Sequence, residues 1–200
     1  MSMRAAVKRQ FFKDMILSRH QPPGPFPLVV ILDHLKPTFN VGKIIRTANS
    51  LGAREVHLIA MPVFHPGPSR GALRCTRTRS FETFGESYRS LTEEGYTLYA
   101  MVPGASQVLG AFEFPQKTAI IIGHEEFGIQ FSFDDFPLVQ KLAIMQMGSI
   151  PSLNASVAMA VASFEYMRQH GFHTHVPASH SESFSSTNAP KCSTLCSPNP

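Results

Sequence analysis

The chain alternates short apolar runs with segments of helical periodicity, and this pattern constrains the fold more than any other feature. Continuous apolar runs predict strands at 28–32, 56–60, 96–102, 118–122 and 142–145. Helical spacing predicts helices, each with a glycine at or just after its end, at 41–52, 81–94 and 152–170. Continuous rather than alternating apolar strands are typical of a parallel sheet covered on both faces. We therefore predict an α/β fold with a mostly parallel sheet and helices on both faces.

Composition narrows the class of protein. Of the 200 residues, 43% are apolar and 16% are charged, which is enough to build a buried core. No apolar run approaches the roughly 18 residues that a membrane span needs, so we expect no membrane partner. Three cysteines cannot form a disulfide framework, and the first 20 residues lack the pattern of a secretory signal. These features favour a reducing, cytoplasmic location.

The net charge of +4 is concentrated in the first 20 residues, which carry five basic side chains, including Arg9 and Lys13, and one acidic side chain. Such an arm could lie along a phosphate backbone, form a solvated amphipathic helix, or serve as an organellar transit peptide. The breaker cluster QPPGPFP at 21–27 separates the arm from the rest. We therefore expect a helical arm over 1–25, one α/β domain over 26–170, and a disordered tail over 171–200, where aliphatic residues are scarce.

Three loops carry the polar residues that matter for chemistry, because ligands of parallel sheets bind beyond the carboxyl ends of the strands. The first holds Asn40, placed to cap a helix, and leads to Arg46 within that helix. The second places Glu125 after the buried run 118–122, with glycines spaced neither as a dinucleotide fingerprint nor as a P-loop. The third places Ser152 and Asn154 where residues cap the last helix. Each feature alone also has a purely structural explanation.

Together and in this order, the three segments resemble the signature motifs of the SPOUT methyltransferases, in particular the TrmH (SpoU-type) branch of RNA ribose 2′-O-methyltransferases. The resemblance covers roughly residues 26–170. The matching residues are Asn40, Gly42, Ile45, Arg46 and Gly52 in the first motif, Gly123, Glu125 and Gly128 in the second, and Ile144, Gly148, Ser152, Leu153, Asn154, Ser156 and Ala158 in the third.

This resemblance implies a C-terminal deep trefoil knot and a homodimer in which each active site is completed across the interface. It also implies S-adenosylmethionine as cofactor and methyl transfer to a ribose 2′-hydroxyl of structured RNA, with tRNA as the first expected substrate and rRNA as the second. No metal is expected. The implied cofactor contacts are Met101, Gly123, Ile144 and Leu153. The implied catalytic residues are Arg46 at the centre, with Asn40, Glu125, Ser152 and Asn154 around it.

A second basic segment, 69–80, contains Arg70, Arg74, Arg77 and Arg79 beside a Pro/Gly-rich loop. Such clustering suggests a surface that follows RNA phosphates. The phenylalanine-rich segment 127–136 is expected to be core or a dimer contact rather than a base-stacking platform.

Three alternatives to the methyltransferase hypothesis remain: a non-catalytic RNA-binding dimer of the same fold, a knotted methyltransferase acting on a base nitrogen, and an unrelated small-molecule α/β enzyme.

Overall fold

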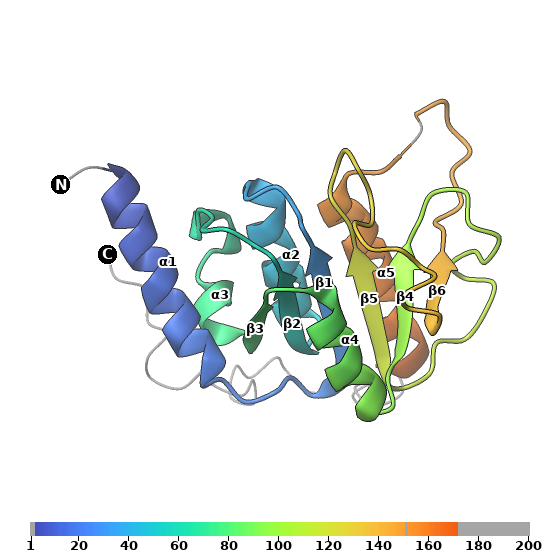
Figure 1. Cartoon of the computed structure of the whole chain (residues 1–200), viewed down its shortest axis with the longest axis horizontal. Helices are drawn as coiled ribbons and strands as arrows, with labels where there is room; N and C mark the ends of the chain where they lie inside the picture. Colours follow the sequence, from blue (N-terminus) through green and yellow to red (C-terminus); the bar gives the residue numbers. More distant parts are fainter. Residues whose placement is uncertain (1–2, 151, 172–200) are drawn as a thin grey trace, which may run out of the picture.

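The computed structural model describes residues 3–150 and 152–171, and within them helices alternate with strands as far as residue 101, after which two further strands and a last helix follow (Figure 1). The predicted tail, from residue 172 onward, lies outside the described residues. In chain order the elements are α1 (Met3–Arg19), β1 (Phe26–Asp33), α2 (Phe39–Ser50), β2 (Ala53–Ile59), the 3-10 turn η1 (Gly67–Ser69), α3 (Ala72–Cys75), β3 (Thr78–Phe81), α4 (Phe84–Glu93), β4 (Thr97–Met101), β5 (Thr118–Ile122), β6 (Val139–Leu142) and α5 (Ala155–His170).

The described strands form one six-stranded sheet in the order β3-β2-β1-β5-β4-β6. Every neighbouring pair is parallel, which confirms the predicted α/β class. The strand order changes direction between β1 and β5, where Leu32 pairs with Ile122 at the carboxyl ends of both strands. Ligands of open α/β sheets bind in the crevice beyond the carboxyl ends of the strands at such a reversal.

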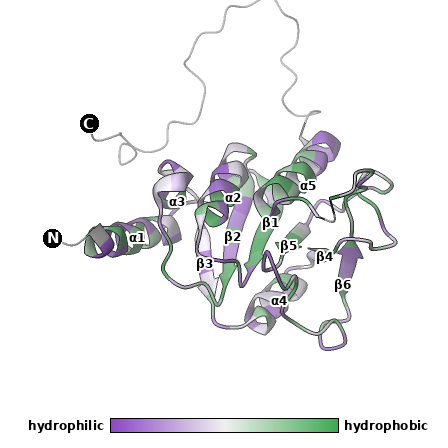
Figure 2. Cartoon of the chain, turned by 90° about the horizontal axis from the view of Figure 1, so that it is seen from above, coloured by the Kyte–Doolittle hydropathy of each residue, from purple (hydrophilic) through white to green (hydrophobic). Residues whose placement is uncertain are grey.

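The core has two layers, because successive strand residues point to opposite faces of the sheet. Along β1, Leu28, Val30 and Leu32 pack in a cluster with α1, α2 and α5, whereas Val29 and Ile31 pack in a second cluster under α4. Figure 2 shows the central strands in green, in agreement with a sheet that is apolar on both faces. The continuous apolar runs in the sequence therefore reflect double coverage.

Two edge strands depart from the sequence prediction. The last strand was expected at 142–145 but spans Val139–Leu142, and β3 was not expected at all. Within β6, Gln140 and Lys141 are exposed, so the strand carries polar residues that break any apolar run. Edge strands such as these have solvent on one side, which is why a search for continuous apolar runs misplaces or misses them.

The basic arm folds as helix α1 and packs against α3. Its buried side chains include Phe11 and Met15, and the Phe11 ring lies 4.9 Å from the ring of Phe64 in an edge-on arrangement. Arg9 and Lys13 are exposed. The arm therefore packs one face on the core and exposes Phe12 and Ile16 together with its basic side chains, so it is only partly amphipathic.

A buried polar network joins β2, β3 and α4. His57, which is fully buried, places Nδ1 2.7 Å from Oγ of Ser87 and Nε2 2.8 Å from Oε1 of Glu55. Arg77 Nε donates to Oε2 of Glu55 at 2.9 Å, and Arg79 Nη1 donates to Oε1 at 3.5 Å. Burial raises the pKa of Glu55, but the bond from His57 and the charges of His57, Arg79 and Arg77 outweigh it and lower that pKa to about 2.

This network predicts loss of stability in acid. A carboxylate whose pKa falls on folding contributes stability above its unfolded pKa, and that contribution disappears as pH drops through the folded pKa. For Glu55, a fall from 4.5 to about 2 corresponds to about 3 kcal/mol, lost between about pH 4.5 and 2. We expect Glu55→Gln to flatten the pH dependence of the unfolding free energy in this window, measured by urea denaturation. The exposed Glu93→Gln is the control, and parallel curves for wild type and Glu55→Gln would contradict the assignment.

Candidate active site

A chain of hydrogen bonds crosses the crevice between β1 and β5. Asn40 Nδ2, in the first turn of α2, donates to Oε1 of Glu125 at 2.9 Å, and the backbone N–H of Lys36 donates to Oε2 at 3.0 Å. Asn154 Nδ2 donates to Oδ1 of Asn40 at 3.2 Å. Three of the five predicted catalytic residues therefore meet in one network, although they come from three separate segments of the sequence.

The helix ends explain how two of these side chains are held. Asn154 is the N-cap of α5, and its Oδ1 accepts a bond from the N–H of Ser156 at 2.9 Å, so the expected capping role is confirmed. Its amide nitrogen remains available for Asn40. The expectation that Asn40 caps α2 was wrong, because the N-cap of that helix is Thr38. Asn40 lies inside the first turn, which frees its whole side chain to bond across the crevice.

Glu125 is presented by a tight turn. His124 and Gly128 exchange two backbone hydrogen bonds, each 2.8 Å long, and Gly128 has a φ of +69°, which favours glycine. A Cβ added at Gly123 would collide with the backbone of Gly128. The glycines of this motif therefore close the turn, and Gly123 as an implied cofactor contact stays a prediction.

The network keeps Glu125 ionised. Burial acts to raise its pKa, but the hydrogen bonds from Asn40 and from the Lys36 amide, together with other local contacts, lower the pKa below its ordinary value. Glu126 beside it pairs with Lys36, whose Nζ lies 2.6 Å from Oε2. At neutral pH Glu125 is thus an acceptor of hydrogen bonds rather than a proton donor.

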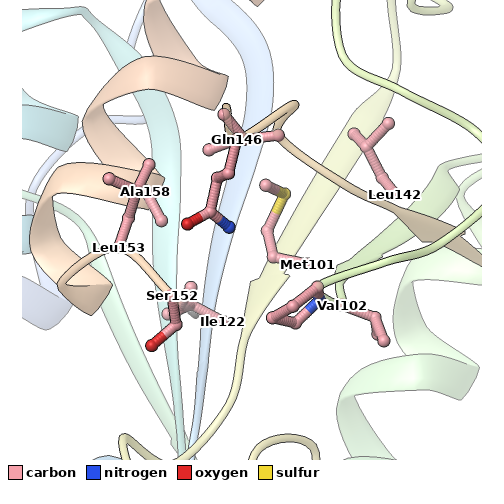
Figure 3. Close-up of a pocket in the computed structure, with 10 residues that line it drawn as sticks. Met101, Val102, Ile122, Leu142, Gln146, Ser152, Leu153 and Ala158 are labelled. Carbon is pink, nitrogen blue, oxygen red and sulfur yellow. The ribbon is translucent and has the colours of Figure 1, made fainter. Parts of the chain in front are cut away.

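An apolar pocket opens beyond the carboxyl ends of β4, β5 and β6 (Figure 3). Ser152, Leu153 and Ala158 lie on one side and Met101, Val102 and Leu142 on the other, with the Gln146 side chain between them. The lining residues are Met101, Val102, Pro103, Ile122, Leu142, Ile144, Gln146, Ser152, Leu153 and Ala158.

Sequence reasoning found part of this pocket. Met101, Ile144 and Leu153, the implied cofactor contacts, line it together with Ser152, whereas Gly123 is adjacent through Ile122 and does not line it. The other lining residues were not among the implied contacts: Val102, Pro103, Ile122, Leu142, Gln146 and Ala158. Val102 and Ile122 end predicted strands and Pro103 follows one, so a strand end was their signal. Ala158 belongs to the third motif, and Gln146 lies between the implied contacts Ile144 and Leu153. Leu142 was expected to begin a strand, so its place at the carboxyl end of β6 had no such signal.

The lining of the pocket has the chemistry to bind a nucleoside, but the pocket is too small to hold one. Its walls combine apolar side chains with the backbone groups that follow each strand, a combination that binds a heterocycle by contact and by hydrogen bonds. Its volume, about 70 Å³, is below the roughly 300 Å³ at which ligand pockets begin. A nucleoside would therefore require an outward shift of the segments that carry Gln146 and Leu153.

Arg46, the implied central catalytic residue, lies elsewhere. It is six residues after Asn40 in α2, which places it about 9 Å further along the helix and about 120° around it. It is exposed and lines a cavity of about 740 Å³, together with Arg70, Arg74 and Arg77. No acidic side chain is among the described residues that line this cavity. The structure therefore joins Arg46 to the second basic segment rather than to the Asn40–Glu125 network of the same chain.

The four arginines of the second basic segment have different surroundings. Arg70 is exposed and has a φ of +51°, and Nε of Arg74 is buried with no hydrogen-bond partner. Arg77 is fixed by its bond to Glu55, yet still lines the cavity. Arg79 does not line it. Its guanidinium bonds Glu55 and Ser90 and lies 4.9 Å from the centroid of the Phe81 ring.

Two structural features, a membrane-spanning helix and a metal-binding cluster, are absent from the residues that the structure describes. No helix in that part of the chain is both long enough and apolar enough to cross a membrane. No group of three or more His, Cys, Asp or Glu side chains in the same residues is arranged to hold a metal ion.

Comparison with known proteins identifies similar chains of known type. A tRNA (guanosine(18)-2′-O)-methyltransferase of Thermus thermophilus is 29% identical over 175 residues, which cover 84% of this chain and 86% of that protein. The Escherichia coli protein of the same description is 28% identical over 164 residues, covering 77% of this chain and 67% of that one.

Solved structures agree. The SpoU methyltransferase AviRb from Streptomyces viridochromogenes superposes with a TM-score of 0.65 and 28% identity, over 76% of this chain and 63% of that one. Its complex with the cofactor AdoMet gives a TM-score of 0.64 at 26% identity, over 73% and 61% of the two chains. The model of the SpoU rRNA Methylase family matches residues 27–164. The chain described here belongs to that family.

Proposed function

We propose that this protein transfers a methyl group from S-adenosylmethionine to a ribose 2′-hydroxyl of RNA, with tRNA as the first candidate substrate and rRNA as the second. One observation carries the proposal: Asn154, the N-cap of α5, belongs to the Asn154–Asn40–Glu125 network, and the two residues just before it, Ser152 and Leu153, line the apolar pocket. Polar groups that can orient a hydroxyl thus lie beside a pocket whose lining, once widened, would suit a nucleoside cofactor. The similarity to tRNA 2′-O-methyltransferases supports the same reaction.

The reaction needs alignment and the loss of one proton. S-Adenosylmethionine supplies the methyl carbon, to which the ribose oxygen bonds as the carbon–sulfur bond breaks and its electron pair stays on sulfur. Ser152 and Asn154 would orient the attacking hydroxyl. Glu125 would hold Asn40 in place rather than accept the proton, because its lowered pKa makes it a poor base. The hydroxyl proton would then pass to water as the alkoxide develops.

Arg46 would stabilise that alkoxide and hold the adjacent phosphate. A guanidinium remains a cation at neutral pH and has no free lone pair to act as general base, whereas its planar fork suits phosphate and negative oxygen. Because Arg46 faces away from the network of its own chain, we propose that it serves the site of a second copy in a homodimer. An exposed apolar stripe on α5, formed by Val157, Val161 and Phe164, is a candidate interface.

We further propose that the chain forms the C-terminal knot of SPOUT proteins. The loop between β4 and β5 bonds two later segments: the backbone N–H of Ala143 donates to the carbonyl of Gln107 at 2.9 Å, and Tyr166 Oη donates to the carbonyl of Gln116 at 2.6 Å. The segment after β6 and the end of α5 are therefore both tied to this loop, as a threaded chain requires.

For the RNA, we propose that the basic cavity of Arg46, Arg70, Arg74 and Arg77 contacts phosphates. Exposed Arg9 and Lys13 on α1 would extend the contact. The bonds of Arg79 to Glu55 and Ser90 suit a structural role at the β2–β3 edge instead. With an RNA substrate of this kind, we expect the protein to act in the cytoplasm.

The variant Arg46→Lys tests the catalytic role. Loss of the guanidinium fork should lower kcat by about 100-fold or more, while the affinity for S-adenosylmethionine measured by calorimetry stays unchanged. The assay digests methylated tRNA to nucleosides, so that ribose methylation and base methylation are distinguished. Lys43→Gln, on the same helix, is the control. Near-normal turnover by Arg46→Lys would refute the role of Arg46, and a methylated base would refute the ribose as target.

Mixed dimers test whether sites are shared. Arg46→Lys and Asn154→Ala are each expected to be inactive alone. If Arg46 serves the partner's site, each mixed dimer holds one intact site, and an equal mixture recovers about a quarter of wild-type activity. Absence of any recovery, with subunit exchange shown by mass spectrometry, would place both residues in a site within one chain.

Salt dependence tests the proposed binding of phosphates. Removing one arginine that binds a phosphate should reduce the slope of log affinity against log salt concentration by about 0.7–0.9. We expect this reduction for Arg70→Gln and Arg74→Gln in tRNA binding, measured by filter retention. Arg89→Gln, exposed on α4 across the sheet, should leave the slope unchanged. Equal slopes for all variants would count against the cavity as an RNA-binding surface.

A further inference from the structure

Phe127 is exposed to an unusual degree for a phenylalanine. Its neighbours in the phenylalanine-rich segment behave as expected: Phe131, Phe133 and Phe136 pack on the core cluster under α4. Phe127 departs from this pattern, because 71% of its surface is open to solvent. Phe39 is similarly open, at 69%. An exposed aromatic ring is a candidate contact for a partner, and here two rings flank one site.

Both rings adjoin the candidate active site. Phe39 directly precedes Asn40, and Phe127 is two residues after Glu125, so the 2.9 Å Asn40–Glu125 bond joins the two segments that carry the rings. The aromatic surface is therefore continuous with the network that would orient the reacting ribose.

Phe127 is also held in place. Its ring stacks on the imidazole of His124, with centroids 4.7 Å apart and planes inclined by 21°. Nδ1 of His124 accepts bonds from the backbone N–H groups of Glu126 at 3.1 Å and of Phe127 at 3.3 Å, which fixes the imidazole. The turn itself is closed by the two His124–Gly128 backbone bonds. Because the ring is already held by His124 on one face, it loses little further conformational entropy when a flat ligand stacks on its open face.

We propose that the outer face of Phe127 stacks an unpaired nucleobase of the RNA substrate next to the ribose that is methylated. This inference rests on the proposed function, since it takes the Asn40–Glu125 network as the place of the ribose. Single-stranded bases commonly stack on exposed aromatic side chains, and every base offers such a face. The stacked base would fix the sugar attached to it against the network, so Phe127 acts as a substrate-binding residue.

The test measures RNA binding without methyl transfer. The probes are a labelled decauridylate and a decamer of the same backbone without bases, each titrated by fluorescence anisotropy in the absence of cofactor. Wild type should bind the decauridylate more tightly, and Phe127→Ala should lose about ten-fold affinity for it while its affinity for the abasic decamer stays the same. Phe127→Leu should match the alanine variant, and Phe127→Trp should restore binding. Leu138→Ala, which truncates a similarly exposed side chain, is the control.

Three results would overturn the proposal. Wild type could bind both decamers equally, Phe127→Ala could retain the preference for bases, or light scattering could show that Phe127→Ala changes the oligomeric mass, in which case the ring packs against a second copy. Failure of the proposed function is separate, because it would be seen as absence of 2′-O-methylation by wild type in the nucleoside assay. If wild type proves inactive but still prefers bases through Phe127, the stacking contact stands as RNA binding by an inactive member of the fold.

Discussion

The hydrogen bond between Asn40 and Glu125 is the contact on which the site depends, because it ties together loops that are 85 residues apart in sequence. The two loops meet because β1 and β5 are parallel neighbours whose pairing runs to Leu32 and Ile122. Parallel strands in this register deliver their following segments to the same edge. Once Glu125 is bonded by Asn40 and the Lys36 amide, Asn154 can join through Asn40, and the start of α5 is positioned as well.

Much of the fold was predictable because most strands are buried on both faces. Residues 118–122 form β5 with the bounds expected from the apolar run, and α5 ends before Gly171 as expected. The edges were not predictable by the same rule. In β6, the exposed Gln140 and Lys141 interrupt the apolar run that would identify a strand, and β3 consists largely of polar residues. The start of α4 shows a different limit: the capping box of Thr83 and Glu86 fixes it, a local signal stronger than the periodicity used to place the helix.

The sequence indicated candidate residues for the site but not how they are arranged. Spacing along the chain does not say which loops share a sheet edge, so the network of Asn40, Glu125 and Asn154 followed from the resemblance and not from periodicity. A local rule also misassigned one role. Asn40 lies two residues beyond the N-cap of its helix and bonds Glu125 instead. A long-range contact decides this role, and a single sequence carries no direct record of such contacts.

Helix α2 carries two residues of the first motif, Asn40 and Arg46, whose side chains lie in different places. Because Asn40 and Arg46 are six residues apart, their side chains leave the helix about 120° apart, and Arg46 lines the basic cavity rather than joining the Asn40–Glu125 network. Of the described cations near the network, Lys36 directs its ammonium to Glu126, which leaves the network built mainly from neutral amides around one carboxylate. Neutral amides can orient a hydroxyl but stabilise a developing negative charge less than a cation does. In the proposed mechanism, α2 would thus provide orientation of the substrate and stabilisation of its charge at two different places, and a twofold assembly is the simplest arrangement in which each site would receive both.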